Sequence, residues 1–310
     1  MEVIRNLRHL KRDNTAIITV GTFDGIHIGH QQLIAKVIED AKLSMGKSTL
    51  VTFSPHPKVI LLQPNAKPIK LLSSDDEKIE LLKKLGLDKL IIIRFTKQFA
   101  NLASEDFFVN ILIKKIGFKQ IVVGHDHAFG RDREGSIDLL KQLATRYDYR
   151  VECMDAVSLD GHIVSSTFIR QQLSRGEIET ANRFLGRPYT LSGRVVAGDG
   201  RGRSLSFPTA NIQPLARNKL IPPDGIYAVK INLGDKTYSG AMSIGVRPTF
   251  SKNKRTIEAF ILNFNGNLYD QILNLHVLKR LRDEKKFDTT ELLIHQMKAD
   301  IKQIEQEFGT

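Results

Sequence analysis

The sequence is short of cysteine, of tryptophan and of long apolar runs. Its one cysteine, Cys153, excludes an intramolecular disulfide and suits the reducing conditions of a cytoplasm. No apolar run approaches the roughly 18 residues that a membrane-spanning helix needs. The segment MEVIRNLRHLKRDN contains no uninterrupted apolar stretch of the kind found in secretory signals. We therefore expect a cytoplasmic protein that has no contact with a membrane.

Aromatic residues are also few, at 7% of the chain, although the formal net charge is +12. A basic barrel that binds RNA or single-stranded DNA is the alternative of a different class. Such proteins place stacking side chains among their basic residues, and this sequence does not. The positive charge is spread over both halves, which suits anionic small substrates as well as an ordinary basic protein. We expect small-molecule partners and no nucleic acid, and the sequence leaves the oligomeric state open.

The first half of the chain alternates short apolar runs with amphipathic stretches. Ser74 and Glu77, three residues apart, have the pattern of a capping box and predict the start of a helix. Continuous apolar strands separated by helices are typical of a parallel sheet that is covered on both faces and binds ligands at the carboxyl ends of its strands. We therefore predict an α/β, Rossmann-like domain. Its expected strands are residues 16–20, 48–53, 89–95, 119–124 and 150–154.

A period of two replaces the helical pattern in the second half. Two long segments, residues 225–245 and 256–278, read as hairpins with turns at Gly-Asp and Asn-Gly. A helical period returns only at residues 289–308. The second half is therefore predicted to be an all-β module closed by one helix. We place the two domains at residues 1–184 and 185–310.

The segment GTFDGIHIGH, residues 21–30, follows the first expected strand and precedes an amphipathic helix. It is not a G-x-G-x-x-G fingerprint, and AKLSMGKS (41–48) lacks the first glycine of a P-loop and follows a helix. A helix start offers free N–H groups to phosphate, and two imidazoles can donate hydrogen bonds to phosphate oxygens whose charge grows during the reaction. This arrangement favours nucleotidyl transfer over two histidines that merely occupy a turn. The histidines are His27 and His30, and the residues expected to shape the pocket are Gly21, Phe23, Asp24, Gly25 and Gly29.

Together with VSSTFIR (164–170), this segment resembles the HxGH nucleotidylyltransferases. The resemblance implies that the second motif holds the polyphosphate, and FSPHP (53–57) and VGHDHAFG (123–130) resemble the FAD synthetase branch. Phe168 stands where arginine is common, and His127 where an aromatic residue is usual. A metal pair at His125 and His127 is a weaker alternative, because no third ligand lies at short spacing. The residues implied for the nucleotide are Asp126, Ser165, Ser166, Thr167 and the catalytic Arg170.

The segment GDGRGRSLSFPTANI, residues 198–212, combines a glycine- and arginine-rich loop with Thr209 and Asn211. The loop can fold over phosphates, although an ordinary surface loop has the same composition. Two neutral oxygens on one face of an extended chain suit Mg²⁺, which needs few protein ligands when phosphates supply the rest. The loop residues expected at the nucleotide are Gly198, Gly200, Arg201, Gly202 and Arg203.

The segments LGRPYTLSGRVVAGDGRGR, FPTANI, DGIYAV, IGVRPTF and IEAFILNF resemble, in this order, those of riboflavin kinases. That resemblance implies a Greek-key barrel in which Thr209 and Asn211 bind the metal and Glu258 is the base. Together the two halves resemble the bifunctional riboflavin kinase/FAD synthetases of bacteria. They imply that ATP phosphorylates riboflavin to FMN and that a second ATP then adenylylates FMN to FAD and pyrophosphate. Each reaction is expected to need Mg²⁺ to neutralise phosphate charge. The alternative is a riboflavin kinase with a weakened or differently specific adenylyltransferase domain.

Overall fold

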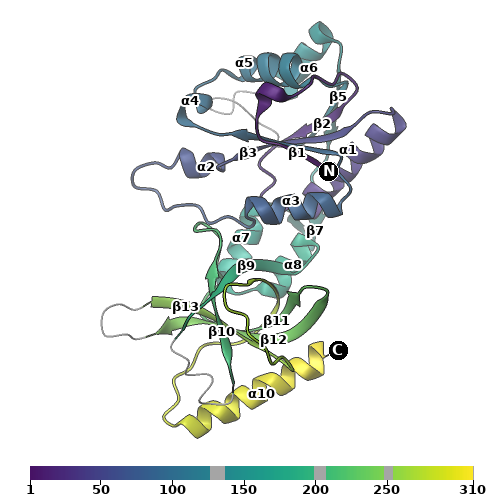
Figure 1. The fold of residues 1–310 in the computed structure, drawn as a ribbon. Helices are drawn as coiled ribbons and strands as arrows, with labels where there is room; N and C mark the ends of the chain where they lie inside the picture. The colour runs from purple at the N-terminus through teal and green to yellow at the C-terminus, as the bar shows by residue number, and fades with distance from the viewer. Residues whose placement is uncertain (126–136, 199–206, 248–253, 310) are drawn as a thin grey trace. The chain divides into compact units, whose positions relative to one another are not determined.

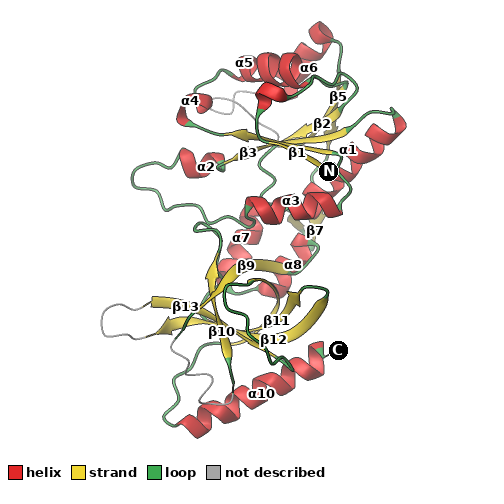
Figure 2. Ribbon diagram, viewed as in Figure 1, coloured by secondary structure: helices red, strands yellow, loops and turns green. Residues whose placement is uncertain are grey.

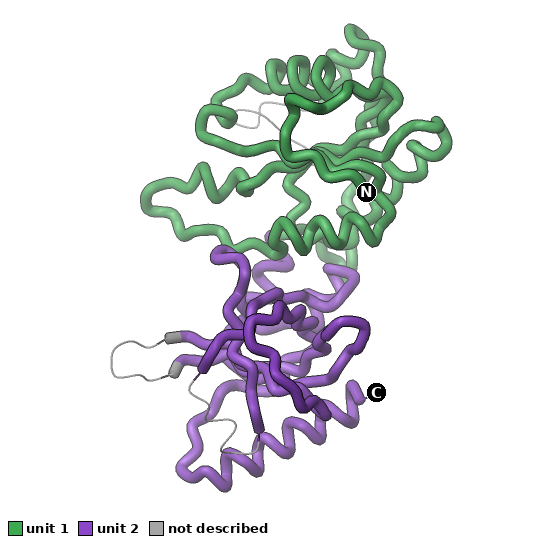
Figure 3. Tube along the Cα trace, viewed as in Figure 1, with its two compact units in different colours: residues 1–166 green, residues 167–310 purple. Residues whose placement is uncertain are grey.

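The structure, a computed structural model, describes residues 1–125, 137–198, 207–247 and 254–309. The chain forms two compact units, residues 1–166 and 167–310, drawn in different colours in Figure 3. Each unit is described by itself below. Within the described residues, no helix has the length and apolar character to cross a membrane.

The first unit is built on a six-stranded sheet in which every neighbouring pair of strands is parallel (Figure 1). The strand order is β1-β4-β3-β2-β5-β6, so the chain moves outward from β2 first in one direction and then in the other. The point between β2 and β5 where the order reverses is where such sheets bind ligands, outside the carboxyl ends of the strands. The strands are β1 (Glu2–Ile4), β2 (Ile17–Val20), β3 (Ser48–Ser54), β4 (Lys89–Arg94), β5 (Gln120–Gly124) and β6 (Arg150–Met154).

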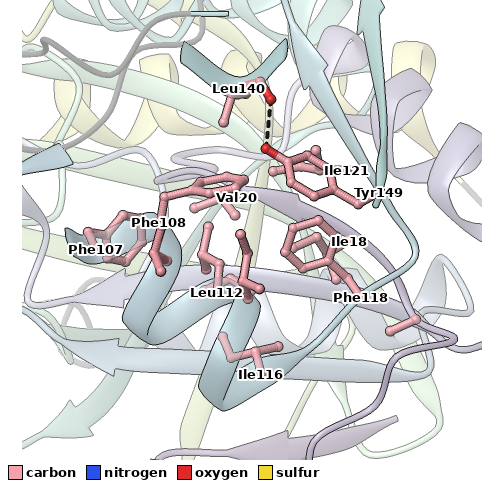
Figure 4. Close-up of a cluster of buried hydrophobic side chains, with 14 of the residues drawn as sticks. Ile18, Val20, Phe107, Phe108, Leu112, Ile116, Phe118, Ile121, Leu140 and Tyr149 are labelled. Atoms are coloured by element: carbon pink, nitrogen blue, oxygen red, sulfur yellow. Dashed lines mark hydrogen bonds between the residues drawn. The ribbon is translucent and has the colours of Figure 1, made fainter. Parts of the chain in front are cut away.

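Helices cover both faces of this sheet, which is why its strands are apolar on both sides. The helix α1 (Ile28–Leu43) and the helix α3 (Asp75–Lys84) pack on the face that carries Ile17 and Leu50. The π-helical segment η2 (Phe107–Ile116) and the helix α6 (Ile137–Tyr147) pack on the opposite face. In Figure 4, aromatic rings of η2 approach Val20, and the Tyr149 hydroxyl donates to the Leu140 carbonyl oxygen at 2.6 Å. The shorter elements are η1 (Leu7–His9), α2 (Pro57–Ile60), α4 (Lys97–Ala100), α5 (Ser104–Asp106), β7 (Ser158–Leu159) and β8 (His162–Ile163).

The second unit is a closed antiparallel barrel with the strand order β10-β13-β12-β11-β14-β9 (Figure 2). Strands β11, β12 and β13 follow one another, and β14 returns to lie beside β11, which is a Greek key. Apolar side chains alternate into the barrel, so that Ile257 and Ala259 are buried while Glu258 between them faces outward. The strands are β9 (Tyr189–Val196), β10 (Thr209–Pro214), β11 (Gly225–Leu233), β12 (Lys236–Arg247), β13 (Lys254–Ile261) and β14 (Ile272–Arg282).

In the described part of the second unit and at its start, the helices are α7 (Ser166–Arg175), α8 (Ile178–Leu185) and α10 (Thr290–Phe308). The C-terminal helix α10 is fixed to β14 by a salt bridge in which Arg282 Nη2 lies 2.7 Å from Asp300 Oδ2. Both the parallel α/β domain and the Greek-key barrel with its C-terminal helix are confirmed. The hairpin predicted for residues 225–245 is formed by β11 and β12. The hairpin predicted for residues 256–278 is wrong, because β13 pairs with β10 and β12 while β14 crosses to pair with β11 and β9.

The helix α8 packs on the barrel within the second unit. Its Asn182 Nδ2 donates to the Val277 carbonyl oxygen at 2.8 Å, and the backbone N–H of Tyr189 donates to Asn182 Oδ1 at 2.7 Å. Residues 167–184 therefore belong to the same compact unit as the barrel. The functional division at residues 184 and 185 stays a prediction.

Candidate active sites

The turn between β2 and α1 holds its backbone in an uncommon conformation. Gly25 has φ 84°, and Phe23 and Ile26 have φ 47° and 40°. A positive φ is strained for bulky and β-branched residues and persists only where the surroundings enforce it. Both side chains are buried, at 3% and 1% exposure, in the core beneath the sheet. The sequence of this turn is therefore constrained by shape as well as by chemistry.

The segment before α3 is hydrogen-bonded to this turn. The Asp24 carboxylate, 2% exposed, accepts hydrogen bonds from the backbone N–H of Leu72 at 2.9 Å and of Ser73 at 3.1 Å. In return, the Gly25 N–H donates to Ser73 Oγ at 3.0 Å. Asp24 was expected to shape the pocket, and the structure directs its carboxylate to these two backbone groups. Ser73 had no signal in the sequence that could have singled it out.

His27 and His30 lie at the start of α1, with their rings stacked at a centroid distance of 3.6 Å and an angle of 16°. His27 is the N-cap of the helix, and its Nδ1 accepts from the His30 N–H at 3.3 Å. When His27 is neutral, its proton therefore lies on Nε2, which can donate to a ligand. An imidazole suits this position because one ring nitrogen caps the helix in place of a serine or aspartate side chain, and the other can face a phosphate.

The charge state of His30 is set by its surroundings. Burial first, and then electrostatic interactions with His27 and Lys78, hold the pKa of His30 well below its usual value. Its Nδ1 is buried and has no hydrogen-bond partner within the described part of the chain. The lowered pKa favours the neutral form of the His30 imidazole.

The two glycines beside the histidines leave little room. A Cβ on Gly21 would lie 3.1 Å from Phe23 Cε2, and one on Gly29 would lie 3.4 Å from His27 Nδ1. Because β2 and β5 are neighbours, Gly124 and His125 at the end of β5 lie at the same edge of the sheet as the turn. Asp126, expected to bind nucleotide, lies outside the described residues.

The second motif begins at the same edge. Ser166 is the first residue of α7, and its Oγ donates to the Asp24 carbonyl oxygen at 2.8 Å. The structure thus joins the two motifs predicted from the sequence, which are 142 residues apart. Ser165 is half-buried. Thr167 and Arg170 follow on α7 and belong to the second compact unit. Phe168, in the place of a common arginine, packs on Phe184 at a ring distance of 4.6 Å.

The candidate kinase residues share the outer face of the barrel. Asn211 and Glu258 are paired across β10 and β13, and Thr209 Oγ1 donates to Glu258 Oε2 at 2.9 Å. Gly198 faces Asn211 so closely that an added Cβ would lie 2.0 Å from Asn211 Nδ2. The four residues are therefore together in this unit. Gly200, Arg201, Gly202 and Arg203 lie outside the described residues.

A second carboxylate, which sequence reasoning missed, lies on this face. Glu284 lies over Gly245 of β12, where an added Cβ would lie 2.1 Å from Glu284 Oε2. Burial raises the pKa of Glu284, the charges of Asp224 and Glu258 add to the rise, and a hydrogen bond from the Val246 N–H opposes it. The segment RLRDEKKF gives no periodic signal that it folds back over a barrel strand, so only the tertiary contacts reveal this residue.

Two family models divide the chain between them. A model described as FAD synthetase matches residues 9–168, and one described as riboflavin kinase matches residues 185–308. A protein of Buchnera aphidicola (subsp. Schizaphis graminum), named bifunctional riboflavin kinase/FMN adenylyltransferase, is 35% identical over 100% of this chain and 99% of its own length. The chain belongs to this bifunctional family. The family and enzyme class expected from the motifs are confirmed.

Other members of the riboflavin kinase/FMN adenylyltransferase family agree. The Listeria monocytogenes protein of that name is 37% identical, covering 93% of this chain and 91% of its own. The Escherichia coli K12 protein is 32% identical, covering 100% and 98%. Among solved structures, one titled macrolide-efflux protein from Streptococcus pneumoniae has a TM-score of 0.88 at 31% identity, covering 99% of this chain and 98% of that one.

Proposed function

We propose that this chain makes FMN from riboflavin and ATP on its barrel, and FAD from FMN and a second ATP at the turn that bears the histidines. The observation that carries the proposal is the presence of two separate constellations. One is a pair of stacked imidazoles at a helix start, at the switch point of a parallel sheet. The other is a carboxylate hydrogen-bonded to a threonine on the outside of a barrel.

For adenylyl transfer, the FMN phosphate attacks the α-phosphorus of ATP and the bond to pyrophosphate breaks. Charge grows on the oxygens of the α-phosphate, and donors fixed in advance stabilise it most. His27 Nε2–H and the free N–H groups at the start of α1 are such donors. Ser165, Ser166, Thr167 and Arg170 would hold the leaving pyrophosphate, as a helix start and a guanidinium suit a polyphosphate.

For the kinase reaction, a primary hydroxyl of riboflavin loses its proton as it attacks the γ-phosphorus of ATP. Glu258 is the proposed base, because a carboxylate within hydrogen-bond reach of the hydroxyl can accept this proton. Thr209 donates to one of its two oxygens, at 2.9 Å, and so orients the carboxylate. Neither reaction needs a covalent intermediate on the enzyme.

We also propose that magnesium serves the kinase site. Within the described residues, no group of three or more histidine, cysteine, aspartate or glutamate side chains is placed to hold a metal. The oxygens of Thr209, Asn211 and Glu258 are nevertheless the hard donors that Mg²⁺ prefers, and ATP phosphates supply its other ligands. Thr209 and Asn211 would hold the ion, which when bound neutralises charge on the transferring phosphate.

The test is to incubate the purified chain with riboflavin, ATP and Mg²⁺ and to separate FMN from FAD with time. We expect FMN first and FAD after it, and FAD directly when FMN is the substrate. FMN that accumulates without FAD would instead support a kinase with a weakened or differently specific adenylyltransferase domain. Loss of both products on removal of Mg²⁺ would support the metal assignment. The small molecules riboflavin, FMN and ATP are the proposed partners, and the single cysteine supports a cytoplasmic location.

A further inference from the structure

Lys78 is a charged residue buried beside the turn that bears the histidines. It lies on the first turn of α3 and is only 6% exposed. Its Nζ donates to the carbonyl oxygen of Thr22 at 2.8 Å, across 56 residues of sequence. A buried ammonium is costly unless it is paired and hydrogen-bonded. The position of this buried lysine beside a candidate active site therefore requires a functional explanation.

The bond from Lys78 acts on the strained part of the backbone. Thr22 immediately precedes Phe23, the first residue with a positive φ. The Thr22 carbonyl oxygen also accepts from Thr52 Oγ1, at 3.2 Å. Asp24, two residues further on, is held by the backbone of Leu72 and Ser73. The residues just before α3 and the first helical turn of α3 thus hold the loop between β2 and α1 at Thr22 and Asp24.

The charge of Lys78 also acts on the imidazoles. Its positive charge contributes to the low pKa of His30, after burial and the charge of His27. Burial in turn lowers the pKa of Lys78, and the carboxylates of Asp75 and Asp24 oppose that fall. Among the described residues, the groups that act on this pair thus come from both the turn and α3.

We propose that Lys78 is a positioning residue for adenylyl transfer, whose ammonium holds the Thr22 carbonyl and so fixes the turn that presents His27 and His30 to the nucleotide. The inference rests on the proposed function of that turn. A role in stability alone explains the residue poorly, because replacing a buried charge by an apolar side chain of similar volume is often neutral or stabilising. Methionine is similar in volume to lysine, but it supplies neither the hydrogen bond to the Thr22 carbonyl nor the positive charge.

The test compares Lys78→Met with Lys83→Met, a control that removes an exposed lysine of the same helix. In Lys78→Met we expect kcat for FMN adenylylation to fall on the order of tenfold to a hundredfold, as misplaced catalytic groups do. KM for ATP should change far less, and phosphorylation of riboflavin by the same protein should be unchanged. An NMR titration should show a higher pKa for His30 in Lys78→Met, because a neighbouring positive charge is gone. Lys83→Met should match the wild-type chain in all four measurements.

The outcomes separate this inference from the proposed function. Wild-type protein that makes no FAD from FMN contradicts the function. Wild-type protein that makes FAD, with Lys78→Met equally fast or losing both activities alike, contradicts the role of Lys78. If thermal unfolding shows that Lys78→Met does not fold, Lys78→Leu, which also lacks a donor, is measured by the same criteria. An unchanged kcat or an unchanged His30 pKa in that variant also overturns the proposal.

Discussion

At the scale of single residues, the two candidate sites use opposite electrostatic designs. At the turn, burial and neighbouring positive charges keep His30 neutral, and His27 uses one nitrogen as a helix cap. On the barrel, Glu258 lies on the outer face and accepts a hydrogen bond from Thr209 at one carboxylate oxygen. Its other oxygen can still accept a proton. In the proposed reactions, the first design would donate hydrogen bonds to developing charge, and the second would take up a proton.

Because the two sites lie on separate elements, their activities should be separable by single substitutions. In Glu258→Ala we expect FMN formation to be abolished, since no base accepts the hydroxyl proton, while FMN is still converted to FAD. In His30→Ala we expect the reverse. The measurement is the rate of each half-reaction with riboflavin or with FMN as substrate. Equal loss of both activities in either variant would refute two separable sites.

The low pKa of His30 also predicts how the stability of the first unit depends on pH. In the folded chain the lowered pKa of His30 favours the neutral imidazole, whereas the unfolded chain binds a proton below the ordinary histidine pKa of 6.5. Folding is therefore favoured above that pH, and stability is lost as the pH falls through it. Unfolding by urea at a series of pH values should show this slope, and His30→Gln should flatten it. A slope that survives this substitution would assign it to other groups.

At the scale of elements, the start of α3 carries much of the first site. Its capping box is formed in full, with the Glu77 N–H bonded to Ser74 Oγ at 3.1 Å and the Ser74 N–H to Glu77 Oε2 at 2.9 Å. The cap ends the segment that grips Asp24 and begins the helix that carries Lys78. A local signal of helix initiation thus fixes the position of a distant turn.

Removal of this cap should affect both stability and one activity. We expect Ser74→Ala to destabilise the first unit by about 1 kcal/mol, the usual loss for an N-cap serine. We also expect it to slow FAD synthesis more than FMN synthesis, because α3 belongs to the first unit and the barrel to the second. Thermal unfolding and the two half-reactions measure this. A larger effect on FMN synthesis would contradict the link between α3 and the turn.

At the scale of the whole molecule, two unlike folds divide one chain, and the helix α8 shows where the second begins structurally. Phe184 is 1% exposed, and Asn182 exchanges hydrogen bonds with both β14 and the start of β9. The barrel therefore packs against residues that precede the match to the riboflavin kinase model at residue 185.

Fragments test this point. We expect residues 167–310 to fold and to phosphorylate riboflavin. We expect residues 185–310 to be less stable, because they lose the side chains of Phe184 and Asn182. Comparison of their unfolding temperatures and kinase rates gives the answer. If both fragments melt at the same temperature, α8 contributes nothing to the barrel, and the boundary predicted from the sequence is the better one.

The sequence was sufficient for features that depend on local periodicity and on short motifs. Apolar runs such as residues 89–95 indicated a sheet covered on both faces, and the alternation in residues 225–245 indicated an antiparallel barrel. The motif around His27 and His30 together with VSSTFIR indicated the family of the first half, and the ordered riboflavin-kinase-like segments from residue 185 onward indicated that of the second.

Contacts between distant segments were decided by folding alone. Ser166 reaches Asp24 across 142 residues, Lys78 reaches Thr22 across 56, and Glu284 folds back over Gly245. No local pattern encodes such pairs, because they depend on strand order and on the register between strands. A register shifted by one residue would turn Glu258 into the barrel and away from Thr209. The sequence thus predicted which residues would serve each reaction. It did not predict the packing that orients them.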